Sequence, residues 1–254
     1  ASYGEQGNDQ ISAFQYLTTF GYNTGTKYRL EMDGSKVNII LPSTIPNPNV
    51  TWEVAKTWNV GMDGNINNGI FAWEFEAFKT RRTNILCTRN ASVPYYTGMT
   101  LNLPDENIGI VSNKGFELQL SHQNRVNEFM YHVAGNFMFA KNKIEFMDET
   151  PWGEGHEYLN QTGQPMGSGL YYQVAGINRT EEDLTKYPQV KGATLGDFYY
   201  KDIDGNGVID SYDRLRSDET TVPQIVFGLN FDAQWRGFDI TVLLQGQAKA
   251  RFYY

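Results

Sequence analysis

The stretch from Trp52 to Thr83 constrains the fold most, because its side chains alternate between apolar and polar along two long runs. A period of two predicts β-strands, since successive side chains leave a strand on opposite faces. Between the runs, Asn68-Gly69 suits a tight type I′ turn that pairs Asn67 with Ile70 and brings both apolar stripes to one face. The stripes comprise Trp52, Val54, Trp58, Val60 and Met62 in the first run, interrupted by Lys56, and Phe71, Trp73, Phe75 and Ala77 in the second.

Two further hairpins repeat the pattern, one from about Ile110 to Lys141 with a polar turn at Gln123 to Asn127, and one that turns at Arg236-Gly237. The strands run about ten residues or more, the length that a tilted strand needs to cross a bilayer. Their stripes are Phe116, Leu118 and Leu120 beside Phe129, Tyr131, Val133, Phe137 and Phe139, and then Ile225, Phe227, Leu229, Phe231 and Trp235 beside Phe238, Ile240, Val242 and Leu244.

The turns within the hairpins are short, whereas the connections between hairpins, 84–109 and 142–224, are long. Outer-membrane barrels have this asymmetry, while connections in soluble domains are mostly short. We therefore predict an all-β fold, a transmembrane antiparallel β-barrel segment with long extracellular loops. The alternative is a soluble sandwich, which would bury Trp58, Phe75, Leu118 and Phe227 against a second sheet or a layer of helices.

Lys56 and Lys79 interrupt the apolar stripes of the first hairpin. Counted from the turn, they stand at nearly equal heights of about 25 Å, the height of the apolar band of a barrel. We expect them at the outer rim, with Arg81 beyond them, where anionic headgroups could neutralise them. On a soluble sheet the same lysines would simply face water.

Outside the hairpins, residues 1–51 are interpreted as the tail of one strand followed by a long loop, with a short strand at Lys36 to Leu41. The net charge of −8 without a basic patch argues against a nucleic-acid partner. Cys87 is the single cysteine, which excludes a disulfide framework. The chain opens without a targeting segment and stops in mid-pattern, so we expect a piece of a longer protein. No residue pair has a supported catalytic geometry, so we expect no enzyme.

The connection 142–224 contains the most specific chemical signal, a twelve-residue acidic loop from Asp202 to Asp213. It fits the calcium-loop template, with Gly207 at the sharp turn. Its strand-like flank at Asp197 to Tyr200 favours a structural role over a switch. An Asp at the last position makes bidentate ligation harder, so magnesium is the alternative ion. The other alternative is an acidic turn that binds no ion and is simply solvated. The predicted ligands are Asp202, Asp204, Asn206, the Val208 carbonyl, Asp210 and Asp213.

Aromatic residues in the long connections are candidates for ligand contact, because sugars stack on exposed rings. They could equally serve an interface or pack a loop on itself. The candidates are Trp152, Tyr158, Tyr171 and Tyr172, with His156 among them, and Tyr95 and Tyr96 in the connection 84–109.

Several motifs resemble the SusC/RagA family of TonB-dependent outer-membrane transporters. They are Ala1 to Asn8, Asn49 to Glu53, Asn107 to Gly109 with Asn113 to Glu117, Gly196 to Phe198 leading into Lys201 to Asp210, and Leu243 to Gly246. The resemblance implies that residues 1–254 are part of one receptor β-barrel domain of 22 strands, without its plug domain and final strands. It places the chain as a multi-pass barrel in the outer membrane of a Gram-negative bacterium. The acidic loop is a family feature that ends in the same Asp.

The resemblance also implies a function, the import of glycans or peptides powered through TonB, which contacts the absent plug segment. A SusD-like surface lipoprotein would close the barrel as a lid, and outer-membrane lipid would surround it. The oligosaccharide or peptide cargo stays open. The alternatives are a soluble, calcium-stabilised carbohydrate-binding module and a surface glycan hydrolase, for which no facing carboxylate pair can be nominated. The lumen face would consist of Glu53, Thr57, Asn59, Glu74, Glu76, Glu117, Gln119, Asn136, Asn230 and Asp232.

Overall fold

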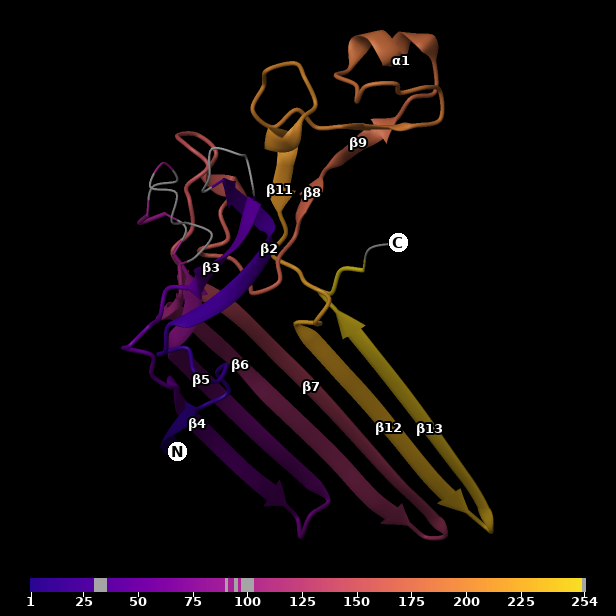
Figure 1. Cartoon of the computed structure of the whole chain (residues 1–254). Coiled ribbons are helices and arrows are strands. Elements are labelled where there is room, and N and C mark those ends of the chain that lie inside the picture. Colours follow the sequence, from indigo (N-terminus) through magenta and orange to yellow (C-terminus); the bar gives the residue numbers. More distant parts are fainter. Residues whose placement is uncertain (30–35, 90, 94–95, 97–102, 253–254) are drawn as a thin grey trace.

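A computed structural model describes residues 1–29, 36–89, 91–93, 96 and 103–252. Its main feature is one antiparallel sheet, seven-stranded in the described part of the chain, in the order β1-β4-β5-β6-β7-β12-β13. Figure 1 shows these strands tilted side by side, with short turns at one end (the turn end) and all long connections at the other (the loop end). The strands are β1 (Ser2–Asn8), β4 (Glu53–Ile66), β5 (Phe71–Thr88), β6 (Asp105–Val126), β7 (Phe129–Phe146), β12 (Ile225–Trp235) and β13 (Phe238–Ala248).

The first hairpin has the predicted register. Ile66 lies opposite Phe71, and the Ile70 amide donates to the Asn67 carbonyl at 3.3 Å. Both central turn residues have positive φ, 55° at Asn68 and 89° at Gly69, as a type I′ turn requires. The alternation from the turn upward therefore places the apolar stripes of β4 and β5 on the same face, as the sequence predicts.

The structure confirms the other two hairpins, but some of their strands end at other residues than predicted. The turn between β6 and β7 is tighter than predicted, because β6 continues to Val126 and pairs it with Phe129. At the loop end β5 continues to Thr88, β6 begins at Asp105 and β7 continues to Phe146, so strand replaces much of the predicted loop 84–109 and the start of 142–224. The ladder continues above the apolar band, where the strict alternation ends because the β5–β6 register shifts at Ile85 and Leu86.

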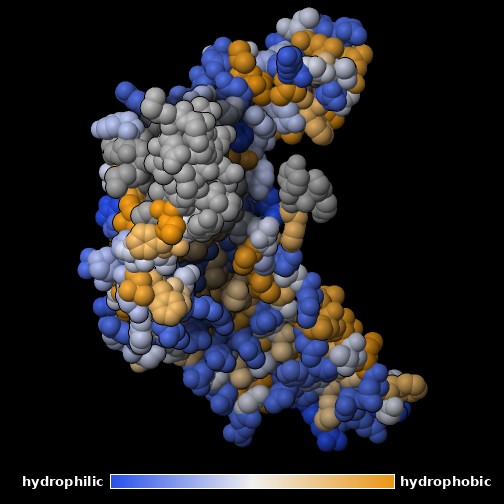
Figure 2. All heavy atoms as spheres, viewed as in Figure 1, coloured by the Kyte–Doolittle hydropathy of each residue, from blue (hydrophilic) through white to orange (hydrophobic). Residues whose placement is uncertain are grey.

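The apolar face of the sheet is uncovered. Trp58 is 61% exposed, Met62 58% and Phe227 45%, and among the described residues no second sheet or helix layer packs on them. The described residues include just three buried hydrophobic side chains, Ile144, Leu159 and Ala233. This contradicts the soluble sandwich and confirms the segment of a membrane-spanning barrel wall, whose stripes face lipid. In Figure 2 hydrophilic residues cover most of the sheet surface that faces the viewer, and hydrophobic residues gather along the β12 and β13 edge.

No helix in the described ranges combines the length and the apolar character needed to cross a membrane.

The basic residues of the first hairpin lie near the loop end, with one adjustment to the prediction. Arg81 lies directly opposite Lys56, not beyond it, while Lys79 lies opposite Trp58, one row nearer the turn. Carboxylates of neighbouring strands pair with two of them, since Glu5 lies 3.2 Å from Lys56 and Glu145 lies 2.7 Å from Arg81. Protein side chains thus already neutralise part of this charge.

The loop end carries small two-stranded sheets that the sequence did not predict in full. β2 (Thr19–Arg29) pairs with β3 (Lys36–Thr44), which includes the predicted strand at Lys36 to Leu41. The connection 147–224, here called the excursion, contains the pairs β8–β11 and β9–β10. Its elements are η2 (Glu157–Leu159), β8 (Leu170–Tyr172), β9 (Val174–Ile177), α1 (Glu181–Lys186), β10 (Phe198–Tyr200), η3 (Ser211–Asp213) and β11 (Arg214–Arg216). Figure 1 shows the excursion rising above the end of β7 and β12.

Candidate functional site

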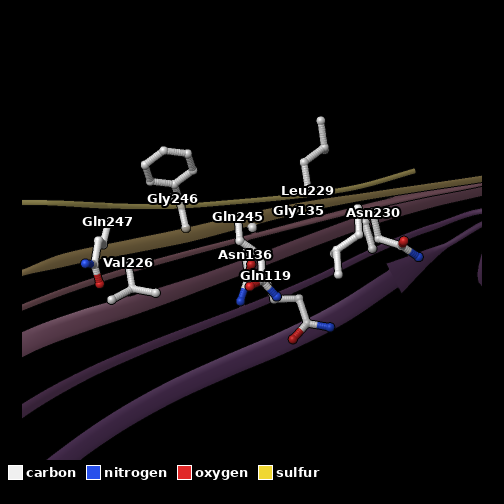
Figure 3. A pocket seen from close by; sticks show the side chains of 13 residues that line it. Gln119, Gly135, Asn136, Val226, Leu229, Asn230, Gln245, Gly246 and Gln247 are labelled. Atoms are coloured by element: carbon white, nitrogen blue, oxygen red, sulfur yellow. The ribbon is translucent and has the colours of Figure 1, made fainter. Parts of the chain in front are cut away.

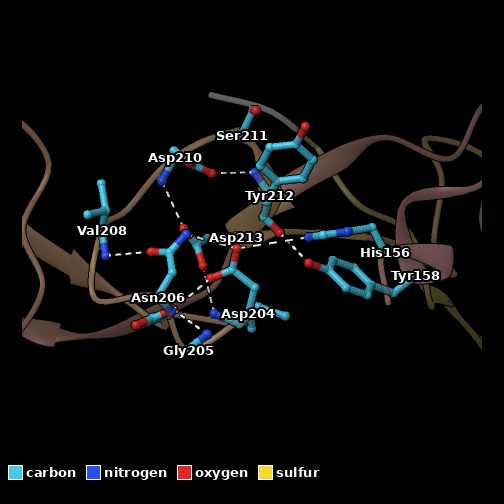
Figure 4. Close-up of polar contacts among 12 residues, drawn as sticks. His156, Tyr158, Asp204, Gly205, Asn206, Val208, Asp210, Ser211, Tyr212 and Asp213 are labelled. Carbon is cyan, nitrogen blue, oxygen red and sulfur yellow. Dashed lines mark hydrogen bonds and ion pairs between the residues drawn. The ribbon is translucent and has the colours of Figure 1, made fainter. Parts of the chain in front are cut away.

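The acidic loop lies between β10 and β11 and closes with the single turn η3. The predicted strand at its start is present as Phe198–Tyr200. Gly205 and Gly207 have φ of 75° and 81°, and Gly207 stands where the calcium template requires a glycine for the sharp turn. Figure 4 shows the resulting coil, with its polar groups directed inward.

Three carboxylates converge inside this coil. Asp202, Asp204 and Asp213 each offer an oxygen, and these oxygens lie within 4.8 Å of one another. Hard cations such as Ca²⁺ and Mg²⁺ take oxygen ligands of this kind. Among the described residues this is the one group of three or more His, Cys, Asp or Glu side chains with such a geometry. The donor set therefore fits the cation that the sequence predicts.

Asp202 is held in place by the backbone of its own loop. One carboxylate oxygen accepts the amides of Gly205 at 2.7 Å and Asn206 at 3.2 Å, and the other accepts the amide of Gly207 at 2.7 Å. These bonds, the one from Gly207 foremost, hold the pKa of Asp202 below its usual range. The group is thus a preoriented anion at neutral pH.

Asp213 is fully buried and joins the two ends of the loop. Its oxygens accept the Ile203 amide at 2.7 Å and the Asp210 amide at 2.8 Å. Asp210 itself lies outside the converging group, and its carboxylate accepts the Tyr212 amide at 2.7 Å. In the calcium template this position often reaches the ion through water, so its place agrees with the pattern.

The remaining predicted ligands lie at the open side of the coil. The Asn206 side chain donates to Asp204 at 2.9 Å, and its oxygen accepts the Val208 amide at 2.7 Å. The Val208 side chain is 59% exposed, as expected where the backbone carbonyl and not the side chain serves the site.

An aromatic cluster packs the acidic loop against the segment that precedes β8. Tyr158 donates its hydroxyl to the Tyr212 carbonyl at 2.7 Å, the His156 ring lies 4.6 Å from the Tyr212 ring, and Trp152 contacts that ring edge-on at 6.4 Å. His156 also approaches Asp204 at 4.0 Å. Burial and the three nearby aspartates raise the pKa of Tyr158. Trp152 and His156 therefore pack the loop on itself, the alternative role that the sequence left open, and the Tyr158 hydroxyl takes part in the same packing.

A cavity of 590 Å³ opens beside this cluster and gathers three of the predicted aromatic residues, Tyr158, Tyr171 and Tyr172. Arg216 and Arg251 join them, and the guanidinium of Arg251 lies 4.9 Å over the Tyr171 ring. Sequence reasoning missed both arginines. No local pattern indicated them, because Arg216 reaches the cavity through the three-residue β8–β11 pair and Arg251 lies far from Tyr171 in the sequence.

Of the other two aromatic candidates, Tyr96 is 88% exposed and lies outside this cavity, and Tyr95 lies outside the described residues.

The polar face of the sheet is the predicted lumen wall. Figure 3 shows Gln119, Asn136 and Gln247 directed to one side of the strands and Leu229 to the other. Polar side chains bond across the strands here, as in the Thr57–Thr80 contact of 2.9 Å, the Asn59–Glu76 bond and the Thr241–Asp232 bond of 2.8 Å. A hollow of 610 Å³ lies over β7, β12 and β13 on this face.

One sheet with a lipid-facing side, a polar side and long connections at a single end defines a class of protein, the outer-membrane β-barrel. A family model described as TonB dependent receptor-like, beta-barrel, matches residues 2–243. The chain therefore belongs to this family, and this confirms the TonB-dependent receptor barrel that the motifs predict.

Curated relatives come from Formosa agariphila. TonB-dependent receptor P3 is 28% identical over 96% of this chain, and TonB-dependent receptor P26 is 25% identical over 97%. In both comparisons the chain spans a quarter (25%) of the relative's length.

Among solved structures, the fold resembles that of the RagAB peptide importer in its closed-closed state, with a TM-score of 0.65 and 18% identity over 98% of this chain and 26% of that one. A structure of the RagAB peptide transporter gives 0.64 with 19% identity, over 96% of this chain and 25% of that one.

Proposed function

We propose that the full-length protein imports nutrient oligomers, glycans or peptides, across the outer membrane by a TonB-dependent route. The observation that carries this proposal is the two-sided sheet, whose apolar side is exposed and whose polar side is cross-linked by side-chain hydrogen bonds. Such a wall encloses an aqueous, plugged lumen, as in large outer-membrane transporters. Its role is to enclose a passage and present loops, so we expect no catalytic residues.

The loops would supply the ligand contacts. The cavity at Tyr158, Tyr171, Tyr172, Arg216 and Arg251 combines aromatic surface with the guanidinium of Arg251, while Arg216 already donates to the carbonyls of Leu159 and Ser168 at 2.8 Å. Rings can stack on sugars and guanidinium groups can pair with peptide carboxylates, so this cavity serves either cargo.

Uptake by a deletion strain tests the proposal. The strain should fail to grow on one class of oligomer as sole nutrient, recover with the full-length gene, and lose uptake when the proton gradient is collapsed. Growth indistinguishable from the parent strain on every glycan and peptide mixture would refute import. Membrane fractions that release the protein in high salt without detergent would favour the soluble binding module instead.

We also propose a lid partner, a SusD-like surface lipoprotein that contacts the loop end. The structural likeness to RagAB supports it through the fold alone. Affinity purification of the full-length protein in mild detergent should recover a lipoprotein at equal stoichiometry. Recovery of the transporter alone, under conditions that keep the barrel folded, would count against this partner.

The acidic loop is proposed to hold Ca²⁺, with Mg²⁺ as the alternative ion, in a structural role. The converging carboxylates of Asp202, Asp204 and Asp213 and the double amide contacts of buried Asp213 support this. Calorimetry of the full-length protein should show calcium binding that is lost in Asp213→Asn and kept in Asp9→Asn, an exposed control with the same change of charge. No calcium heat at about millimolar concentration, the weak end of such loops, rejects the site.

A further inference from the structure

Two adjacent rows of basic side chains cross the lipid-facing side of the sheet near its loop end. In the lower row Lys79 lies opposite Lys114, and Lys114 lies opposite Lys141. In the upper row, two residues further along each strand, Lys56 lies opposite Arg81, and Lys143 lies across Ser112 from Arg81. Directly opposite residues have Cβ atoms about 4.5–5.5 Å apart, so the three lysines of the lower row are immediate neighbours.

The rows begin where the apolar stripes end. The next row toward the turns consists of Ala77, Phe116 and Phe139, and at the same height as Lys79 the rings of Trp58 and Tyr3 lie 4.6 Å apart. Trp and Tyr in this position are typical of the membrane–water interface. The basic rows, here called the basic belt, therefore lie at the level of lipid headgroups and touch the acyl-chain region below.

Carboxylates on the protein neutralise half of the belt. Glu5 pairs with Lys56, Glu145 with Arg81, and Asp218 with Lys141 at 3.1 Å. Glu145 also interacts electrostatically with Lys79. Within the part of the chain that the structure describes, Lys114 and Lys143 have no carboxylate partner, although both are exposed. Six cations thus face three carboxylates.

Like charges directly opposite each other destabilise a sheet unless an anion lies between them. The anion that fits here must be placed at headgroup level and must tolerate an apolar surface immediately beneath it. A phosphate carried on acyl chains satisfies both conditions, and the compact ammonium groups of lysines bind phosphate well. We propose that Lys79, Lys114 and Lys143 bind the phosphate groups of an outer-leaflet glycolipid of the lipid A type, whose chains lie on Phe116 and Phe139.

Retention of lipid by the full-length protein tests this site. The protein is reconstituted in phosphatidylcholine nanodiscs that contain a small fraction of bisphosphorylated lipid A, and bound lipid is measured by native mass spectrometry. Each lysine near an anionic surface contributes about fivefold in affinity, so K114Q/K143Q should lose most of the bound lipid A. The matched control K186Q/K191Q, which makes the same charge change on exposed lysines of the excursion, should keep it, and K114R/K143R should restore it.

Two further arms separate the sources of phosphate. Dephosphorylated lipid A should bind no better to the parent protein than to K114Q/K143Q, and inorganic phosphate should not displace the phosphorylated lipid at equal concentration. Equal retention of lipid A by the parent and K114Q/K143Q, with both proteins folded as judged by heat-modified gel mobility, overturns the proposal. Displacement by inorganic phosphate alone would show a simple anion site and overturns the lipid assignment.

Discussion

In the sheet large apolar side chains stay exposed, whereas in the excursion between β7 and β12 polar side chains are buried. Trp58 and Met62 are more than half exposed on the sheet, while Asn178 and Asp213 of the excursion are fully buried. The sheet needs no core, because its backbone ladder is satisfied between strands and lipid covers its apolar face. The excursion lies in water and buries few apolar side chains besides Leu159, so hydrogen bonds from buried polar groups help to fix its shape.

The comparison predicts that the two faces of the sheet respond differently to one charge. Leu118 lies between Phe75 and Phe137 on the lipid face, and its neighbour Gln119 faces the lumen. Leu118→Lys should destabilise the barrel by about 2–4 kcal/mol, the cost of a lysine near the bilayer midplane, and Gln119→Lys by much less. Urea unfolding of the full-length protein in lipid vesicles measures both. Equal losses for the two variants would mean that the assignment of the faces is wrong.

In the excursion the largest loss of stability should follow from removing a buried side-chain amide. The side chains of Asn178 and Gln189 donate to each other at 2.9 and 3.0 Å, and this pair joins β9 to the segment after α1. Asn178→Ala removes both bonds and leaves the half-buried Gln189 amide with its bond to the Asp183 carbonyl at 3.1 Å, so we expect a local loss of about 1–3 kcal/mol for the two bonds. Hydrogen exchange of residues 174–200 should accelerate while that of β5 to β7 stays unchanged.

The control is Gln173→Ala, an exposed amide of the same excursion, which should change local stability by less than about 0.5 kcal/mol. If hydrogen exchange in the excursion is the same in Asn178→Ala as in the parent protein, buried polar pairs do not stabilise this region.

The smallest predicted effect concerns pH. Asp183 caps the short helix α1 by accepting the amides of Thr180 at 2.9 Å and Arg179 at 3.0 Å, and these bonds hold its pKa below the ordinary value near 3.8. A carboxyl with a depressed folded-state pKa stabilises the fold above its unfolded pKa and loses that contribution as pH falls through the folded value. Helix α1 should therefore stay folded at neutral pH and unfold below about pH 4, the usual carboxyl range.

Hydrogen exchange of residues 178–189, corrected for the intrinsic rate at each pH, measures this opening. Asp183→Asn should remove the acid transition in this segment and leave that of the acidic loop in place. An unchanged acid transition in the variant would show that another group controls it.

The period-two pattern was sufficient to predict the sheet, because every second residue of a barrel strand faces lipid and is therefore apolar. The register at Asn68-Gly69 follows from turn chemistry. The coil in which Asp202, Asp204 and Asp213 converge agrees with the spacing of the calcium template, and the bound ion stays a prediction. The pairing of Leu170–Tyr172 with Arg214–Arg216 was not predictable in this way, because strands of three residues carry too few positions to show a period.

The hairpins, the apolar and polar faces of their strands, the TonB-dependent receptor family and the coil of the acidic loop could therefore all be predicted, because each depends on residues near one another in the chain. The tertiary structure was needed to show how strands β4 to β7 align with one another. It alone aligned Lys79, Lys114 and Lys141 in one row, and it alone brought Arg251 over the Tyr171 ring. Such neighbours depend on the register between strands and on loop closure, and neither is encoded in a local pattern.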